Sequence, residues 1–596
     1  MASPHSFHIP VMGIGFTIDT PLKVSHLGVN SVVSLVDDSL LERLRKKYSK
    51  LYSLAYQPIP EKSEDARTNR ITAYLDMLHQ LTKQKFENLF RVEQPNWEAL
   101  KDYFDLLPNS SQLKKQFVGW INEARPSQDL IRRIREQVKP GRIDVNIMTK
   151  VDKANFKGKT QLGIEFNDAH AALRGFANST LESTLVLSAG MSPRLYGYLT
   201  QFEDFFADAT GFIKKKIALK VSDYRSALIQ GKFLAKKGIW VSEYRIESGL
   251  NCGGHAFATD GHLLGPILSE FRDNRADLTE SVHQLLSAAL VVQAKPVPEK
   301  PMELQITAQG GVGTAKEHEF LLETYDVDSV GWGSPFLLVP EATTVDEPTR
   351  NQLAEAKEPD LYLSGISPLG VPFNNLRANS KDQSRRTLTA KGKPGSSCPK
   401  KYLASNIEFT EEPICTASRQ YQHLKLKELG TLNISAGEHA KRFDQIVEKS
   451  CICVGLGTSA LLVNELSTKI EGPEVSICPG PNMAYFDHKM SLKEMVDHIY
   501  GKANVIARSD RPHMFIKELR LYIDYLVQKA TDWEAEMTEK NLKYLRRFVT
   551  NLEAGISYYH SLFSEKGIQY TETLVHLDAE ATRLSLFSQD LDVALV

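Results

Sequence analysis

The sequence predicts a (β/α)₈ barrel that carries a helical insertion after its first βα unit and a mainly helical, cysteine-bearing C-terminal extension. Three observations lead to this fold class. Short apolar, β-rich runs alternate with helix-forming segments up to about residue 340. Two consecutive strands near the end of this alternation are each followed by a glycine-rich loop. A stretch rich in Lys, Arg, Glu and Leu interrupts the alternation early in the chain.

The strands are recognised as short runs of apolar and β-branched residues between polar or helical segments. Helix-forming segments such as 265–271 and 278–291 separate several of them. Alternation of this kind indicates a parallel sheet with crossover helices, either open or closed into a barrel. The predicted strand runs are 10–13, 29–35, 143–148, 185–188, 217–221, 240–246, 304–308 and 327–331.

The chain divides by composition into four parts. We expect the barrel to comprise residues 1–37 and 141–375, interrupted by a helical insertion at 38–140. Residues 376–484 read as a cysteine-rich loop region, because they open with the basic, Gly/Ser-rich stretch 378–400. Residues 485–596 read as a helical region that opens with a capping-box pattern, Ser-x-x-Glu.

Overall composition bounds the classes of partner and location. A chain of 596 residues predicts two or three folding units. Its 72 Lys and Arg nearly balance its 73 Asp and Glu, so nucleic acid is not indicated as a partner, although a local basic patch stays open. No apolar run approaches the roughly 20 residues that span a bilayer. No secretory signal is visible, and we therefore expect a cytoplasmic protein with no membrane partner.

Two glycine loops carry the strongest local signal. Each follows a predicted strand, and helix-forming sequence follows the first. Glycines let the backbone approach an anion, and a helix N-terminus offers free N–H groups. A tight turn without a ligand would explain either loop alone, but the ordered pair indicates the phosphate site usual at strands 7 and 8 of a barrel. The loop residues are Gly310, Gly311, Gly313, Thr314, Gly333 and Ser334.

Four segments together resemble the nitronate monooxygenase-like flavoproteins, and within that group the enoyl-reductase component of polyunsaturated-fatty-acid synthases. These segments are 10–33, 143–146, 247–255 and 306–336, and residues 341–363 resemble the part that follows the barrel in the enoyl reductases. The match covers most of 1–36 and 141–375. It implies a (β/α)₈ barrel that binds FMN and acts as an oxidoreductase.

The resemblance also assigns cofactor residues. It implies that Gly311, Gly313, Thr314, Gly333 and Ser334 bind the FMN phosphate, and that Met12, Gly13 and Asn146 lie near the isoalloxazine ring. Ser188 follows the predicted strand at 185–188 and is a candidate for lining the same pocket. Asp223 and Glu243 are further polar candidates at strand ends.

His255 is the candidate catalytic residue. It follows Gly254 in a segment that resembles the family's Ala-Gly-Gly-His sequence, which implies that it exchanges a proton with the substrate. Imidazole suits this role because its pKa lies near neutrality. A structural histidine at a strand end is the alternative. The family often has Gln-Gly-x-Glu-Ala where residues 248–252 read Ser-Gly-Leu-Asn-Cys, so the resemblance does not extend to simple nitronate oxidation.

Five of the six cysteines fall between residues 398 and 478. Cys-Pro pairs occur among iron–sulfur ligands, and we interpret Cys398, Cys415, Cys453 and Cys478 as ligands of one [4Fe–4S] cluster. A zinc site and buried reduced thiols are the alternatives. Cys451 alternates with Cys453 in an apolar run, so we expect a strand there with Cys451 pointing away.

The leading functional hypothesis is an FMN-dependent oxidoreductase for a small or acyl-type substrate, with His255 as proton donor or acceptor. An iron–sulfur cluster and an electron-donor protein would fit this chemistry. The second hypothesis is a flavoenzyme that modifies RNA or protein docked on the extra helices. The third is a non-enzymatic binding protein on a barrel scaffold.

Overall fold

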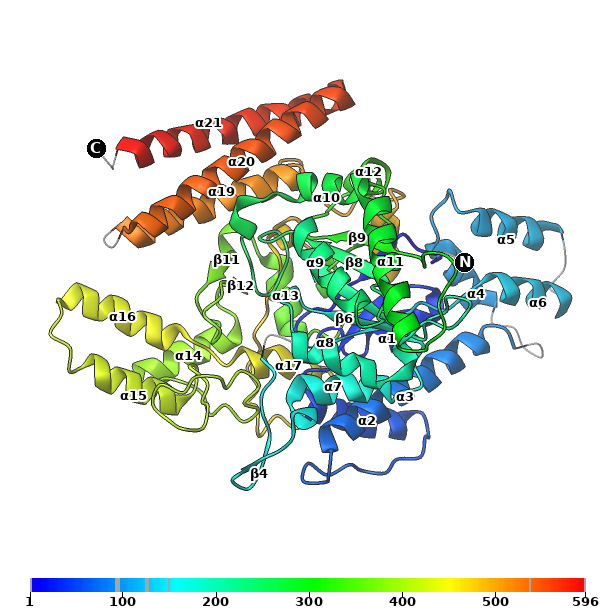
Figure 1. Ribbon diagram of the computed structural model, residues 1–596, viewed down its shortest axis with the longest axis horizontal. Helices are drawn as coiled ribbons and strands as arrows, with labels where there is room; N and C mark the ends of the chain where they lie inside the picture. Colours follow the sequence, from blue (N-terminus) through cyan, green and yellow to red (C-terminus); the bar gives the residue numbers. More distant parts are fainter. Residues whose placement is uncertain are drawn as a thin grey trace.

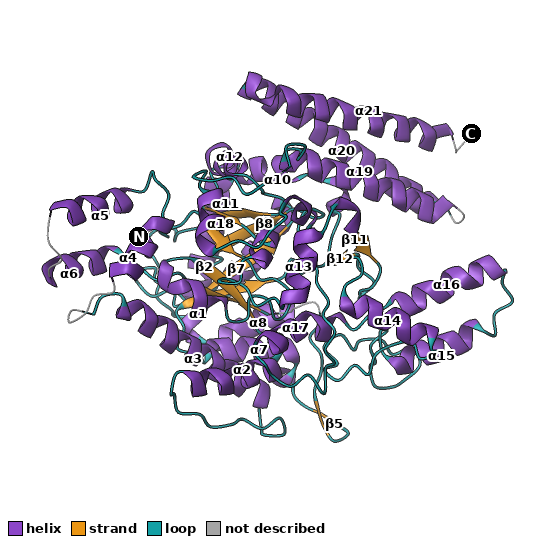
Figure 2. Cartoon of the chain, turned by 180° about the vertical axis from the view of Figure 1, so that it is seen from behind, coloured by secondary structure: helices purple, strands orange, loops and turns teal. Residues whose placement is uncertain are grey.

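A closed barrel of eight strands lies at the centre of the computed structural model, which describes residues 3–91, 97–123, 128–147, 151–506, 508–534 and 537–593. Figure 2 shows its strands enclosed by helices. The strand order is β1-β10-β9-β8-β7-β6-β3-β2, and every neighbouring pair is parallel. The predicted (β/α)₈ barrel is therefore confirmed. The strands are β1 (Phe7–Ile9), β2 (Asn30–Ser34), β3 (Ile143–Asn146), β6 (Ser183–Leu187), β7 (Lys215–Val221), β8 (Glu243–Glu247), β9 (Gln305–Gln309) and β10 (Ser329–Gly331).

Seven strands overlap the predicted runs, and the opening strand lies just before its predicted position. β1 ends at Ile9, whereas the sequence indicated residues 10–13. Pro10 has no N–H group to donate to a neighbouring strand, which accounts for the end of the ladder there. Residues 10–13 instead form the loop that leaves the barrel at the C-terminal end of β1.

Helices connect successive strands around the barrel. They are amphipathic or buried on the face that covers the sheet, as parallel strands require. The connecting helices are α1 (Thr20–Val24), α7 (Asp168–Ala177), α8 (Pro193–Tyr198), α9 (Tyr224–Ala235), α10 (Leu264–Asp273), α11 (Arg275–Val292) and α12 (Ala315–Tyr325).

The connection from β2 to β3 is the helical insertion. Part of it has a hydrophobic cluster of its own, in which Phe86, Tyr103, Phe104 and Ile134 are buried. Figure 1 shows α4, α5 and α6 projecting from the side of the barrel near the N-terminus. The insertion contains α2 (Asp38–Leu51), α3 (Ala66–Asn88), α4 (Trp97–Leu106), α5 (Gln112–Glu123) and α6 (Gln128–Gln137).

The segment 376–484 is more ordered than the loop region that composition indicated. The basic stretch at 378–400 contains a helix. The Asn379 side chain stabilises its N-terminus by accepting a hydrogen bond from the N–H of Asp382. Residues 451–453 begin a helix and are not a strand. The helices here are α14 (Ser380–Ala390), α15 (Arg419–Leu429), α16 (Ala436–Glu448) and α17 (Ile452–Val463). They follow an antiparallel hairpin, β11 (Leu361–Ser364) and β12 (Phe373–Leu376).

The last part of the chain is helical, as expected, and packs onto the barrel. Its first helix begins at the predicted capping box, in which Ser491 and Glu494 bond each other's backbone N–H groups. Figure 1 shows α19, α20 and α21 stacked beside α10 and α12. These helices are α18 (Leu492–Ile499), α19 (Met514–Trp533), α20 (Glu539–Lys566) and α21 (Thr571–Val593).

Within the described ranges no single helix is long and apolar enough to cross a bilayer. Only α16 and α17 taken together, with a bend of 41° between them, reach the required length and composition.

Candidate active site

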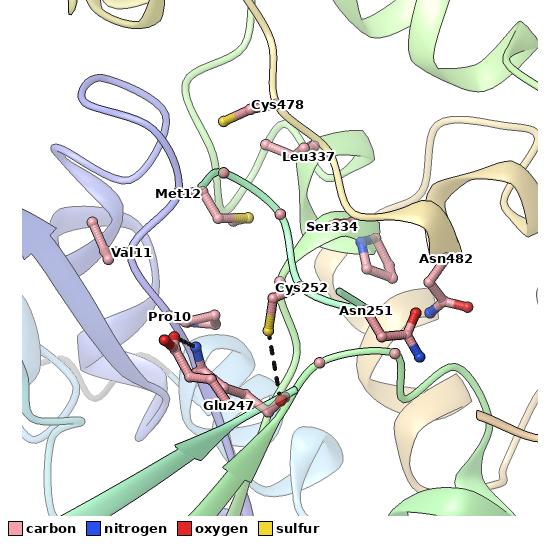
Figure 3. A pocket seen from close by; sticks show the side chains of 18 of the residues that line it. Pro10, Val11, Met12, Glu247, Asn251, Cys252, Ser334, Leu337, Cys478 and Asn482 are labelled. Atoms are coloured by element: carbon pink, nitrogen blue, oxygen red, sulfur yellow. Dashed lines mark hydrogen bonds between the residues drawn. The ribbon is translucent and has the colours of Figure 1, made fainter. Parts of the chain in front are cut away.

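An open cavity lies at the C-terminal ends of the barrel strands, the end at which barrel enzymes carry their active sites. Figure 3 shows side chains from several separate loops pointing toward it. The walls come from the loops after β1, β8, β9 and β10 and from residues 477–482 of the C-terminal extension.

Seven of the residues singled out in the sequence line this cavity together. They belong to the two glycine loops, the loop after β1 and the turn before His255. They are Met12, Gly13, Gly254, Gly310, Gly311, Gly333 and Ser334.

Two other predicted cofactor residues end barrel strands without reaching the cavity wall. Asn146 is the last residue of β3, and its carbonyl accepts a hydrogen bond from the N–H of Leu35. Ser188 follows β6 directly and is buried. Both therefore lie at the expected end of the barrel, but the cavity lining does not include them.

The glycine loop after β9 requires glycine at two positions. Gly310 and Gly311 have φ angles of +112° and +88°, which residues with a Cβ rarely adopt. A Cβ at Gly311 would lie 1.8 Å from Nδ2 of Asn251. From the sequence, we expected glycine at this position because a phosphate approaches the backbone. The structure shows that the Asn251 side chain also excludes a larger residue.

Gly313 and Thr314 occupy the start of α12. The Thr314 hydroxyl caps the helix by accepting from the N–H of Glu317. The Glu317 carboxylate in turn accepts from the N–H of Gly313 at 2.8 Å. Burial opposes ionisation of Glu317, but Arg511 outweighs it and keeps the pKa of this carboxyl below its usual value. The Glu317 carboxylate thus already partly neutralises the partial positive charge at the N-terminus of α12.

A charged pair lies at the base of the cavity. Lys220 at the end of β7 donates to Oε1 of Glu247 at the end of β8, at 3.1 Å. The Gln309 amide nitrogen donates to the same carboxylate. Both Lys220 and Glu247 line the cavity, so an ion pair lies in its wall.

One buried acceptor in the cavity wall, Oδ1 of Asn251, has no hydrogen-bond partner within the described part of the chain. Oε1 of Gln309 instead lies beside the His8 ring. A buried polar atom without a partner costs free energy, so the Asn251 oxygen indicates a ligand with an N–H or O–H donor.

His255 is not among the residues that line the cavity, although its sequence neighbour Gly254 is. Its Nε2 atom is 2.7 Å from the Ser367 hydroxyl, and its ring meets the Phe373 ring edge to face. A β-bridge joins its backbone to Phe373. The β11–β12 hairpin therefore fixes the position of the imidazole.

The cavity also contains two thiols, from Cys252 and Cys478, which point in different directions in Figure 3. Burial raises the pKa of Cys478 to about 12. Burial and the nearby Glu247 carboxylate raise the pKa of Cys252 well above its usual value. Both thiols are therefore protonated at neutral pH and unsuited to act as thiolate nucleophiles.

The four cysteines expected to bind an iron–sulfur cluster are divided between two places. Cys478 lines the cavity and contacts the backbone of Gly254 and Gly13. The thiol of Cys398 instead contacts those of Cys415 and Cys451.

Cys451 therefore does not point away from the other thiols, as a strand would have required. Contact with Cys415 raises the pKa of Cys398 to about 11. Within the described residues, no three His, Cys, Asp or Glu side chains are placed to hold a metal ion.

Asp223 and Glu243 have structural roles. Asp223 caps α9 by accepting from the N–H of Ser226. Glu243 begins β8, at the opposite end of the barrel from the cavity, and pairs with Arg245 and Arg142. Burial opposes its ionisation, but these arginines lower the pKa of Glu243 to about 2.

Several residues of the site were not predicted from the sequence. Lys220 and Glu247 end adjacent strands, and a charged residue at that position of a barrel strand is the signal that would have found them. Asn482 and Arg511 belong to the C-terminal extension, and no local pattern links them to the barrel.

Comparisons with known proteins find similarity to solved structures only. No family model and no curated protein matches the sequence. FabK from Thermotoga maritima matches with a TM-score of 0.30 and 12% identity, over 67% of this chain and 82% of that one. The enoyl reductase domain of MlnA from the macrolactin biosynthesis cluster of Bacillus amyloliquefaciens matches with 0.31 and 13%, over 72% and 87%. Nitroalkane oxidase from Streptomyces ansochromogenes matches with 0.28 and 11%, over 63% and 83%.

These TM-scores carry no argument about function. The assignment of a barrel rests on the strand pairing of this chain.

Proposed function

We propose that this chain is an FMN-dependent oxidoreductase that acts on a small or acyl-type substrate. The observation that carries the proposal is the cavity at the barrel mouth. Two glycine loops bound it, and the unpartnered buried oxygen Oδ1 of Asn251 lines it.

The residues present fit FMN. The loops at 310–312 and 333–334 line the cavity, and their backbone N–H groups would bind a phosphate. Oδ1 of Asn251 would accept a hydrogen bond from an N–H or hydroxyl group of the cofactor. Bound FMN would supply hydride and electron transfer, for which the protein's own side chains are unsuited.

The remaining groups of the site serve charge and proton transfer. The Lys220 ammonium, paired with Glu247 in the cavity wall, would donate a hydrogen bond to negative charge on a bound ligand. His255, held by Ser367, is the group that exchanges a proton with the substrate. The loops that enclose the cavity limit the access of water.

No iron–sulfur cluster is included in this proposal. Its predicted ligands do not fit one site, because Cys478 lines the cavity while Cys398 contacts Cys415 and Cys451. Electron delivery is therefore assigned to a partner or co-substrate outside this chain.

The optical spectrum of the purified protein tests the proposal. We expect a yellow protein with the absorbance band of an oxidised flavin, and FMN as the flavin that heat denaturation releases. FMN is expected because the two loops provide one monophosphate site and the sequence has no second pyrophosphate motif. Release of FAD alone, or failure of the apoprotein to bind any flavin, would contradict the proposal.

A further inference from the structure

Three consecutive carbonyl groups of the glycine loop are bonded by side chains from the C-terminal extension. The Gly311 carbonyl accepts from Nη2 of Arg511 at 2.8 Å. The Val312 carbonyl accepts from Nδ2 of Asn482 at 2.7 Å. The Gly313 carbonyl is 2.8 Å from Nε2 of His498. These donors lie 170 to 200 residues after the loop in the sequence.

The bonds fix the direction of the loop's N–H groups as well. In a planar trans peptide the C=O of one residue and the N–H of the next point in opposite directions. Holding the carbonyls of residues 311–313 therefore fixes the direction of the N–H groups of residues 312–314. The N–H of Gly313 donates to the Glu317 carboxylate, so it is not available to a ligand. Anion binding by such a loop depends on the direction of its N–H groups.

Arg511 is held in one position by its own partners. Its guanidinium pairs with both oxygens of Glu317, at 2.7 and 2.9 Å, and donates to Oδ1 of Asn482 at 3.1 Å. The Arg511 side chain is only 6% exposed, so water competes little for these bonds. The arginine and asparagine therefore act on the loop as one unit.

His498 is held in a single tautomer. A carbonyl oxygen only accepts, so Nε2 carries the proton that bonds Gly313, and Nδ1 accepts from the N–H of Val505 at 3.3 Å. Burial lowers the pKa of His498, so the ring is neutral. Trp332 and Phe486 pack edge to face against it.

We propose that Asn482, His498 and Arg511 are positioning residues that hold the glycine loop in its phosphate-binding form. Recognition of the cofactor's phosphate then depends on the C-terminal extension as well as on the barrel. The inference rests on the proposed function, because it concerns the phosphate of FMN. Riboflavin, which has the same ring and ribityl chain but no phosphate, separates this role from a general effect on the site.

The test measures the Kd of the full-length apoprotein for FMN and for riboflavin by fluorescence titration. We expect the wild-type protein to prefer FMN. His498→Leu retains the apolar packing but loses the hydrogen bond, so it should weaken FMN binding roughly 10- to 100-fold while changing riboflavin binding little. His498→Gln should retain the preference, because its side-chain amide can donate in place of Nε2.

Arg511→Gln removes a second donor to the loop, and the same two Kd values are measured for it. This variant tests the proposal if His498→Leu does not fold. Arg508→Gln is the matched control, because Arg508 pairs with Asp510 and Glu358 and makes no bond to the loop. It should leave the ratio of the two Kd values unchanged.

The outcomes separate the two proposals. Equal losses of FMN and riboflavin binding in both variants would show a structural role only and overturn the inference while the proposed function stands. Equal affinity of the wild-type protein for the two flavins would also overturn the inference and leave the proposed function standing. A wild-type apoprotein that binds neither flavin would overturn the proposed function, and the inference with it.

Discussion

At the scale of single residues, the position of the His255 imidazole depends on a contact with the β11–β12 hairpin. Its imidazole contacts Ser367, which is fully buried in the loop between β11 and β12. The histidine follows the barrel strand β8, so its position depends on two segments more than 100 residues apart. The hairpin thus orients a group that the barrel alone would leave unsupported.

Replacement of His255 tests its chemical role. His255→Ala should leave FMN bound, because the glycine loops lie elsewhere in the cavity, and should slow turnover roughly 10²- to 10⁴-fold, the range for a lost general acid or base. Steady-state kinetics and flavin content together measure this. Ser367→Ala is the control for orientation and should cost less. Loss of flavin from the His255 variant would indicate a structural role, and unchanged turnover would assign the proton to another group.

Glu518 predicts a pH dependence of stability. This carboxyl on α19 is buried against Ser248 and the N–H of Leu264, and burial raises its pKa from 4.5 to about 7. Because the folded pKa lies above the unfolded one, its contribution is complete below about pH 4.5 and is lost as the pH rises through 7. The loss is about 3 kcal/mol, since each pKa unit corresponds to about 1.4 kcal/mol.

Thermal unfolding of the wild-type protein and of Glu518→Gln at pH 5.5 and pH 8.5 checks this expectation. The variant should gain stability relative to the wild type at the higher pH, because glutamine carries no charge to bury. Identical differences at the two pH values would contradict the assignment.

At the scale of elements, the glycine loop between β9 and α12 is the most constrained connection of the site. Gly311→Val should abolish flavin retention, because the residue has a positive φ and a Cβ would collide with Asn251. Gly437→Val is the control, since a Cβ at Gly437 on the exposed face of α16 meets open space. Flavin content after gel filtration measures both. Full retention by the Gly311 variant would remove this loop from the cofactor site.

The helices α14 and α17 show where local patterns mislead. The polar, glycine-rich composition of 378–400 indicated a loop, yet Asn379 caps α14 within it. The apolar run at 451–463 suggested a strand, yet it forms the helix α17. A short apolar run has no periodicity that separates a strand from a buried helix. The strand interpretation therefore predicted the wrong direction for the Cys451 side chain.

At the scale of the whole molecule, the C-terminal extension completes the barrel's cavity. Residues 477–482 line it, and Asn482, His498 and Arg511 bond the loop after β9. Cofactor binding and docking of the extension are then thermodynamically linked, because each favours the same loop conformation.

Hydrogen exchange tests this linkage. Addition of FMN to the apoprotein at about 100 times its Kd should stabilise the folded state by about 2.7 kcal/mol. Amide exchange should slow in residues 311–314 and also in residues 498–506 and 511–518 of the extension. Mass spectrometry of peptides from both regions measures the change, with α5 of the insertion as the internal control. Protection confined to the barrel would contradict the linkage.

The sequence by itself determined the barrel and indicated the two glycine loops that bound its cavity. Its strands are local runs of β-branched and apolar residues, and its glycine loops are local as well, so both are visible without tertiary contacts. The position of His255 was visible for the same reason, since it follows two glycines after β8.

The tertiary structure alone decided which distant residues join these local features. Arg511, Asn482 and His498 reach the glycine loop from 170 to 200 residues away, and nothing in their own sequence environment distinguishes them. The pairing of Lys220 with Glu247 and the grouping of Cys398 with Cys415 and Cys451 are also long-range contacts. Such contacts form because packing of the extension against the barrel buries apolar surface and brings the polar groups together. The apolar pattern of each segment predicts a buried face but does not show which other segment covers it.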